Sequence, residues 1–149
     1  MKVLIADDSD LILSWLSEML TAFKQVEIVA RLKNGNDALT ALLDLKPDLA
    51  IVDLRMPGMS GLEVLREIRK VNKDVKFMIL TFYAFDSYRQ SATTAGVDYF
   101  LSKVDDFEKV SKVVTELLGK ESNNQSGIGQ PHGVEPLINN SGIALTFNK

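Results

Sequence analysis

Short apolar runs alternate with helical patterns along the first 119 residues. Five runs are apolar enough to predict strands buried on both faces, as in a parallel sheet; they cover residues 2–6, 26–32, 49–52, 75–80 and 97–101. Between and after them, apolar residues recur with the 3.6-residue period of amphipathic helices; these segments cover residues 10–23, 38–45, 61–71, 85–95 and 105–118. This alternation predicts an α/β fold, a doubly wound parallel sheet with right-handed crossovers.

The last predicted helix should end at Gly119, because glycine is favoured just past a helix C-terminus. The sequence from 120 to 131 is polar and rich in Gly, Ser and Asn, which is typical of a flexible linker. We therefore expect one domain over residues 1–119 and a flexible tail over 120–149 with no second domain. The alternative for the apolar stretch 134–149 is a short segment that docks on the domain or on a partner.

Composition excludes several functional classes. No apolar run approaches the ~18 residues of a membrane span. Acidic residues follow the first apolar run too early for a secretory signal. The chain has no cysteine, which rules out disulfides and thiolate metal sites and fits a cytoplasmic protein. A net charge of −3 carries no signature of nucleic-acid binding, so we expect no direct nucleic-acid and no membrane partner.

Polar residues follow four of the five predicted strands. Asp7 and Asp8 follow the first, Asp53 the third, Thr81 the fourth and Lys103 comes after the fifth. The carboxyl ends of parallel strands meet at one edge, where open α/β sheets bind their ligands. Each residue alone has an ordinary explanation, such as helix capping for the acids or a solvated surface for the lysine. Their combination at one edge favours a functional site.

These residue types together predict phosphoryl-transfer chemistry. Three carboxylates in one pocket repel one another unless a cation neutralises them. Hard oxygen ligands in a partly open site suit Mg²⁺. An aspartate can act as a nucleophile that forms an acyl phosphate. A lysine and a hydroxyl can then stabilise the charge on the transferring group.

Residues 1 to about 119 resemble the receiver domain of bacterial response regulators. The motifs that carry the resemblance are Asp7-Asp8, Asp53 followed by Met56-Pro57-Gly58 and Gly61, Thr81, and Lys103. The resemblance implies a flavodoxin-like, five-stranded parallel sheet of order 2-1-3-4-5 with five helices. The sequences at 99–103 and from Asp106 are similar to receivers that precede LuxR/NarL-type DNA-binding domains, and we expect no such domain in residues 1–149.

The resemblance also implies roles for the acidic residues. Asp53 would be the phosphoacceptor. Asp8 would bind Mg²⁺ directly and Asp7 through water, with Asp53 and the backbone carbonyl of Arg55 as further ligands.

The remaining roles concern phosphate binding and signal output. Thr81 would bond a phosphoryl oxygen and Lys103 would pair with the phosphate. Phe100 matches the switch aromatic that turns inward on activation, and the output face would lie within residues 84–118. The phosphodonor would be a sensor histidine kinase or a phosphotransfer protein, and a homodimer through the output face is a further expectation.

Three positions depart from the family pattern. Val104 stands where a proline commonly follows the lysine, and Phe100 stands where a tyrosine would offer a hydroxyl. Bulky Phe82, followed by Tyr83, replaces a small residue after the threonine. We expect Phe82 and Tyr83 to modulate access to Asp53, so that Phe82→Ala speeds phosphorylation by small donors and changes dephosphorylation; equal rates would refute this.

Three functional classes are compatible with these residues. The preferred one is a phosphorylation-dependent signalling switch, which catalyses only its own phosphorylation and dephosphorylation. The alternative is a pseudo-receiver, a binding module independent of phosphorylation, and only Phe82 supports it. A turnover phosphatase of the haloacid-dehalogenase type is disfavoured, because such enzymes carry a second aspartate where this chain has Arg55.

Overall fold

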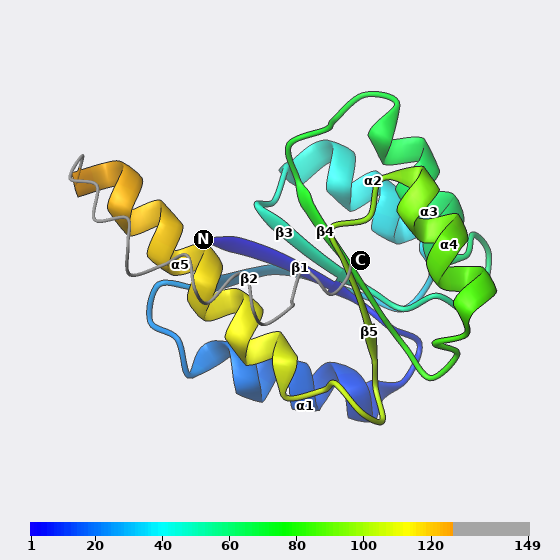
Figure 1. Cartoon of the computed structure of the whole chain (residues 1–149), viewed down its shortest axis with the longest axis horizontal. Coiled ribbons are helices and arrows are strands. Elements are labelled where there is room, and N and C mark those ends of the chain that lie inside the picture. The colour runs from blue at the N-terminus through cyan, green and yellow to red at the C-terminus, as the bar shows by residue number, and fades with distance from the viewer. Residues whose placement is uncertain (127–149) are drawn as a thin grey trace.

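The computed structural model describes residues 1–126, in which five strands and five helices alternate strictly (Figure 1). The elements are β1 Lys2–Ala6, α1 Asp10–Thr21, β2 Glu27–Leu32, α2 Gly35–Leu45, β3 Leu49–Val52, α3 Gly61–Arg69, β4 Lys76–Thr81, α4 Asp86–Ala95, β5 Tyr99–Ser102 and α5 Lys109–Ser126. The part of the predicted tail from 127 to 149 lies outside the described residues. No helix in the described part of the chain is both long and apolar enough to span a membrane.

The strands form one parallel sheet of order β2-β1-β3-β4-β5. This confirms the predicted flavodoxin-like fold. Helices α1 and α5 cover one face of the sheet, while α2, α3 and α4 cover the other (Figure 1). Strand β3 therefore lies between β1 and β4, with helices on both sides, and the chain that leaves it emerges near the middle of the carboxyl edge.

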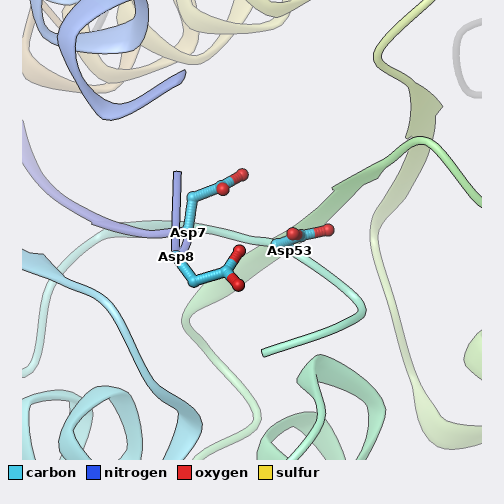
Figure 2. Close-up of side chains that lie close together, drawn as sticks. All are labelled: Asp7, Asp8 and Asp53. Carbon is cyan, nitrogen blue, oxygen red and sulfur yellow. The ribbon is translucent and has the colours of Figure 1, made fainter. Parts of the chain in front are cut away.

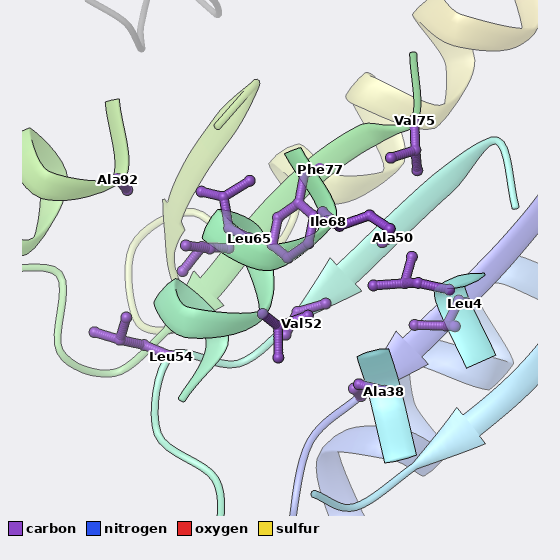
Figure 3. Packing of buried hydrophobic residues seen from close by; sticks show 14 of the residues in the cluster. Leu4, Ala38, Ala50, Val52, Leu54, Leu65, Ile68, Val75, Phe77 and Ala92 are labelled. Carbon is purple, nitrogen blue, oxygen red and sulfur yellow. The ribbon is translucent and has the colours of Figure 1, made fainter. Parts of the chain in front are cut away.

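Two apolar clusters hold the helices to the sheet. Successive strand residues point to opposite faces, so each central strand supplies both clusters. Leu4, Val52 and Phe77 pack toward α2, α3 and α4 (Figure 3). Ile5, Ile51 and Met78 pack toward α1 and α5. All four residues of β3 are at most 1% exposed, and full burial of one such large apolar side chain contributes about 1.5–3 kcal/mol. The strand before Asp53 is thus held rigidly.

Local capping fixes where α1 and α3 begin after the loops that follow β1 and β3. Ser9 caps α1, because its side chain accepts a hydrogen bond from the amide of Ile12 at 3.3 Å. Ser60 and Glu63 form a reciprocal capping box at the start of α3. A Cβ at Gly61 would collide with the backbone carbonyl oxygen of Asp53, so only glycine lets α3 begin so close to that strand end.

The structure corrects the predicted last helix. We expected it over 105–118 with Gly119 as its end, whereas α5 starts at Lys109 and continues to Ser126. Its start is delayed because Asp106 accepts a hydrogen bond from the amide of Ser102 at 2.9 Å and holds a turn there. An apolar contact from the chain beyond it frequently accompanies a terminal glycine, and the residues that follow Gly119 are polar. The helix therefore propagates through Gly119 at one backbone hydrogen bond per residue.

Candidate functional site

The sheet order brings the predicted site residues to one edge. The backbone amide of Asp53 donates to the carbonyl of Ala6 at 2.9 Å, which continues the pairing of β1 with β3 by one residue. The amide of Lys103 donates to the carbonyl of Thr81 at 2.9 Å and does the same for β4 and β5. These bonds register the carboxyl end of β1 against that of β3 and the end of β4 against that of β5. The parallel pairing of β3 with β4 brings the two pairs together at one edge.

Three carboxylates converge at this edge. One oxygen from each of Asp7, Asp8 and Asp53 lies within 4.8 Å of the others. Figure 2 shows Asp7 and Asp8 from the end of β1 beside Asp53 from the end of β3. Asp7 and Asp53 are buried, at 2% and 7% exposure, whereas Asp8 is exposed. The cluster is closed on the protein side and open toward solvent at Asp8.

Lys103 partly neutralises the two buried carboxylates. Its Nζ lies 2.6 Å from Oδ2 of Asp7 and 3.3 Å from Oδ2 of Asp53, and its side chain is only 3% exposed. The other oxygen of Asp7 accepts a hydrogen bond from the amide of Ser9 at 2.9 Å. Both oxygens of Asp7 thus have protein partners. Among the described residues, the carboxylate of Asp8 has no such partner, so it is free to bind an incoming group.

The site has more negative than positive charge. Burial, together with the nearby charge of Asp7, raises the pKa of Asp53 from 3.8 to about 6, although Lys103 opposes both effects. One ammonium beside three carboxylates leaves an excess of negative charge. This donor set, all oxygen and partly open, fits a hard divalent cation. The arrangement therefore has the chemistry of a metal-binding pocket.

Thr81 is the last residue of β4, and two aromatic residues, Phe82 and Tyr83, follow it. Thr81 is fully buried, and its Oγ1 accepts a hydrogen bond from the amide of Tyr83 at 2.9 Å. This bond turns the chain so that Phe82 is 57% exposed, with the centroid of its ring 4.8 Å from Nζ of Lys103. Phe82, expected from the sequence to modulate access to Asp53, therefore contacts the site lysine directly.

Arg55, in the loop after β3, contacts Tyr83 in the loop after β4 and Tyr88 in α4. Its Cζ lies 4.3 Å from the centroid of the Tyr83 ring, and its Nη2 donates to the hydroxyl of Tyr88 at 3.1 Å. Sequence reasoning assigned a role only to the backbone carbonyl of Arg55 and none to Tyr88. No pattern in the sequence pairs these residues, because they lie 33 positions apart.

Phe100 lies on the inner side of β5 and is only 2% exposed. It packs with Ile79 of β4 and Ala92 of α4 in the cluster beneath α2, α3 and α4. The ring thus occupies the inward position. Residues 84–118, named from the sequence as the output face, include the second half of the loop after β4 together with α4, β5 and part of α5.

Comparison with known proteins identifies the family. The response regulator receiver domain matches residues 3–115. Response regulator protein VraR of Staphylococcus saprophyticus is 30% identical over 121 residues, 81% of this chain and 58% of that protein. Response regulator GacA of Pseudomonas aeruginosa is 28% identical, with 78% of this chain and 54% of that protein covered. The chain thus spans only about half the length of these curated relatives.

Solved structures agree with this assignment. The signal receiver domain of the putative response regulator NarL from Mycobacterium tuberculosis superposes with a TM-score of 0.72 at 25% identity, covering 78% of this chain and 94% of that one. A LuxR-family DNA-binding response regulator from Staphylococcus aureus gives a TM-score of 0.68 at 31% identity, covering 77% and 96%. The chain belongs to the response regulator receiver domain family.

Proposed function

We propose that this receiver domain is a phosphorylation-dependent signalling switch and that Asp53 accepts the phosphoryl group. The observation that carries the proposal is the buried carboxylate of Asp53, 3.3 Å from the ammonium of Lys103 and grouped with the carboxylates of Asp7 and Asp8. Phosphoryl transfer depends mainly on positioning and on neutralising charge, and this site supplies both.

The proposed metal is Mg²⁺. Asp8, Asp53 and the backbone carbonyl of Arg55 would bind it directly, whereas Asp7 would act through water because both of its oxygens already have protein partners. When bound, Mg²⁺ would neutralise the excess negative charge and coordinate oxygens of the phosphoryl group.

In the proposed reaction, an ionised oxygen of Asp53 attacks the phosphorus of a phosphohistidine. The new O–P bond forms as the N–P bond breaks, and the electron pair of the broken bond remains on the imidazole nitrogen. Lys103 would then pair with one phosphoryl oxygen and the hydroxyl of Thr81 would donate to another. With its pKa near 6, the Asp53 carboxyl is mostly ionised at neutral pH, as a nucleophile must be.

The donor would be a sensor histidine kinase or a phosphotransfer protein. The signal would pass from Asp53 to the face formed by α4, β5 and α5, because Thr81 and Phe100 lie on the paired strands β4 and β5. A DNA-binding domain of a longer regulator, a separate effector or a second copy of this chain would then bind that face. The matched relatives are longer than the part that aligns with this chain, and this supports an effector domain as the target of that face.

Intact-mass measurement tests the proposal. The protein is incubated with acetyl phosphate and Mg²⁺, beside Asp53→Asn and a reaction containing EDTA. We expect one phosphoryl group on the wild type and none on the variant or without Mg²⁺. The same series is run with Phe82→Ala and with a phosphorylated histidine phosphotransfer protein as donor. Failure of every donor to phosphorylate either protein would overturn the proposal and favour the pseudo-receiver, for which the aromatic rim at Phe82 is the supporting observation.

A further inference from the structure

The ring of Phe82 lies against the ammonium group of Lys103. Its centroid is 4.8 Å from Nζ of Lys103, within the ~6 Å range of a cation–π interaction. Phe82 itself is 57% exposed and belongs to neither of the two apolar clusters. Core packing therefore does not account for its position.

The ammonium of Lys103 contacts two carboxylates and one aromatic ring. Asp7 and Asp53 hold the ammonium from within the protein at 2.6 and 3.3 Å, and the Phe82 ring lies over it at the mouth of the site. The lysine side chain is 3% exposed although it lies next to an open site. An aromatic face attracts a cation without adding negative charge. The site already has an excess of carboxylates. The Phe82 ring can therefore hold the Lys103 ammonium from the solvent side without increasing that excess.

We propose that Phe82 is a positioning residue for Lys103. Its ring keeps the ammonium between the two buried carboxylates, at the place from which it can pair with a phosphoryl oxygen on Asp53. This role rests on the proposed phosphorylation of Asp53. It differs from that of a simple access barrier, because it depends on the aromatic face of Phe82 and not only on its volume.

Leucine separates the two roles of Phe82. Phe82→Leu keeps an apolar side chain at the rim but removes the aromatic face, whereas Phe82→Tyr keeps both. A barrier alone predicts that the leucine variant is phosphorylated as fast as the wild type or faster. Positioning predicts that it is phosphorylated more slowly, because Lys103 is then less often in place. Phe82→Ala changes both properties at once and cannot separate them.

The first measurement needs no phosphorylation. Proton–nitrogen NMR of the lysine ammonium groups detects Lys103, whose signal is assigned by its loss in Lys103→Met. A cation over the face of a ring is shifted upfield by the ring current. We expect the Lys103 signal to move downfield in Phe82→Leu and to stay near its wild-type position in Phe82→Tyr. An unchanged signal in the leucine variant would overturn the proposed contact.

The second measurement is the rate of phosphorylation by acetyl phosphate, followed by intact mass. We expect Phe82→Leu to be about two- to tenfold slower than the wild type and Phe82→Tyr to be within about twofold of it. Phe85→Leu is the matched control, because Phe85 is 59% exposed and contacts Tyr83 and Tyr88 instead of Lys103. This control should show the same small change as Phe82→Tyr.

The outcomes separate the two proposals. A Phe82→Leu variant that is phosphorylated as fast as the wild type or faster would overturn positioning and leave Phe82 as a barrier. A Lys103 signal that depends on the Phe82 ring, in a protein that takes no phosphoryl group from any donor, would support the contact and overturn the proposed function. Slower phosphorylation of Phe82→Leu, together with a downfield shift of its Lys103 signal, would support both the proposed function and the positioning role of Phe82.

Discussion

Arg89 of α4 holds Phe100 of β5 through two contacts. Its Cζ lies 4.8 Å from the centroid of the Phe100 ring, and its Nη1 donates to the backbone carbonyl of Phe100 at 3.0 Å. A single guanidinium therefore connects the helix of the proposed output face to both the side chain and the backbone of the proposed switch residue. A rotation of the Phe100 ring away from its inward position requires that its contact with the guanidinium changes.

We expect Arg89→Ala to lower the free energy of unfolding by about 1–2 kcal/mol, because one charge-assisted hydrogen bond and one cation–π contact are lost. Urea unfolding followed by fluorescence of the single tryptophan, Trp15, measures this. Arg66→Ala, which removes an exposed arginine from α3, should change stability by less than about 0.5 kcal/mol. Equal effects of the two substitutions would contradict the role of Arg89.

Asp53→Asn should stabilise the metal-free protein at neutral pH. Burial raises the pKa of Asp53 to about 6, so the folded state binds its proton more tightly than the unfolded chain does. The ionised carboxyl therefore destabilises the fold progressively as pH rises from about 4 to about 6, and the full penalty applies above that range. At about 1.4 kcal/mol per pKa unit, the penalty is up to about 3 kcal/mol.

Urea unfolding of both proteins between about pH 4 and pH 8 in EDTA measures this difference. The variant should gain its advantage as the Asp53 carboxyl ionises and keep it at higher pH. Added Mg²⁺ should then stabilise the wild type more than the variant, because a bound cation neutralises the ionised carboxyl. A stability difference that does not vary with pH would show that Asp53 titrates normally.

Lys103→Met should destabilise the fold by more than about 3 kcal/mol, because it leaves the buried carboxylate of Asp7 without its partner at 2.6 Å. Adding Asp7→Asn to the Lys103→Met variant should recover part of the lost free energy of unfolding. A double-mutant cycle measures the coupling, which we expect to exceed about 1 kcal/mol. The exposed pair Lys70 and Glu67, with N and O atoms 2.8 Å apart, is the control and should couple by less than about 1 kcal/mol. Equal coupling in the two pairs would argue against a special role for burial.

Gly119→Ala tests the corrected end of α5. In the structure Gly119 lies inside the helix, and a Cβ there would meet no atom within 4 Å. Alanine should therefore stabilise the protein by about 0.5–1 kcal/mol. If the helix ended at Gly119 with a left-handed residue, as expected from the sequence, alanine would destabilise instead. Gly96, which ends α4 with a φ of +96°, is the matched control, and Gly96→Ala should lower stability by about 1 kcal/mol.

The order of strands and helices was predictable from the sequence, and so was the set of residues at the strand ends. The apolar period of a strand or helix is a local property, because it reports which face of that element is buried. Once the elements alternate, a parallel sheet is expected, and its carboxyl edge carries Asp7, Asp53, Thr81 and Lys103. The hydrophobic pattern and the family resemblance together therefore predicted which faces are buried, the order of the strands and the convergence of the site residues at one edge.

Only the tertiary structure decided which of these side chains contact one another. Lys103 could have paired with any of three carboxylates, and its 2.6 Å contact with Asp7 depends on the packing of β1 against β3 and of β4 against β5. The contact of Phe82 with Lys103 depends on the turn that Thr81 holds. Gly119 did not decide where α5 ends, because the helix continues through that residue to Ser126. Rotamers and helix ends depend on their surroundings in the folded chain, and a one-dimensional pattern does not contain those surroundings.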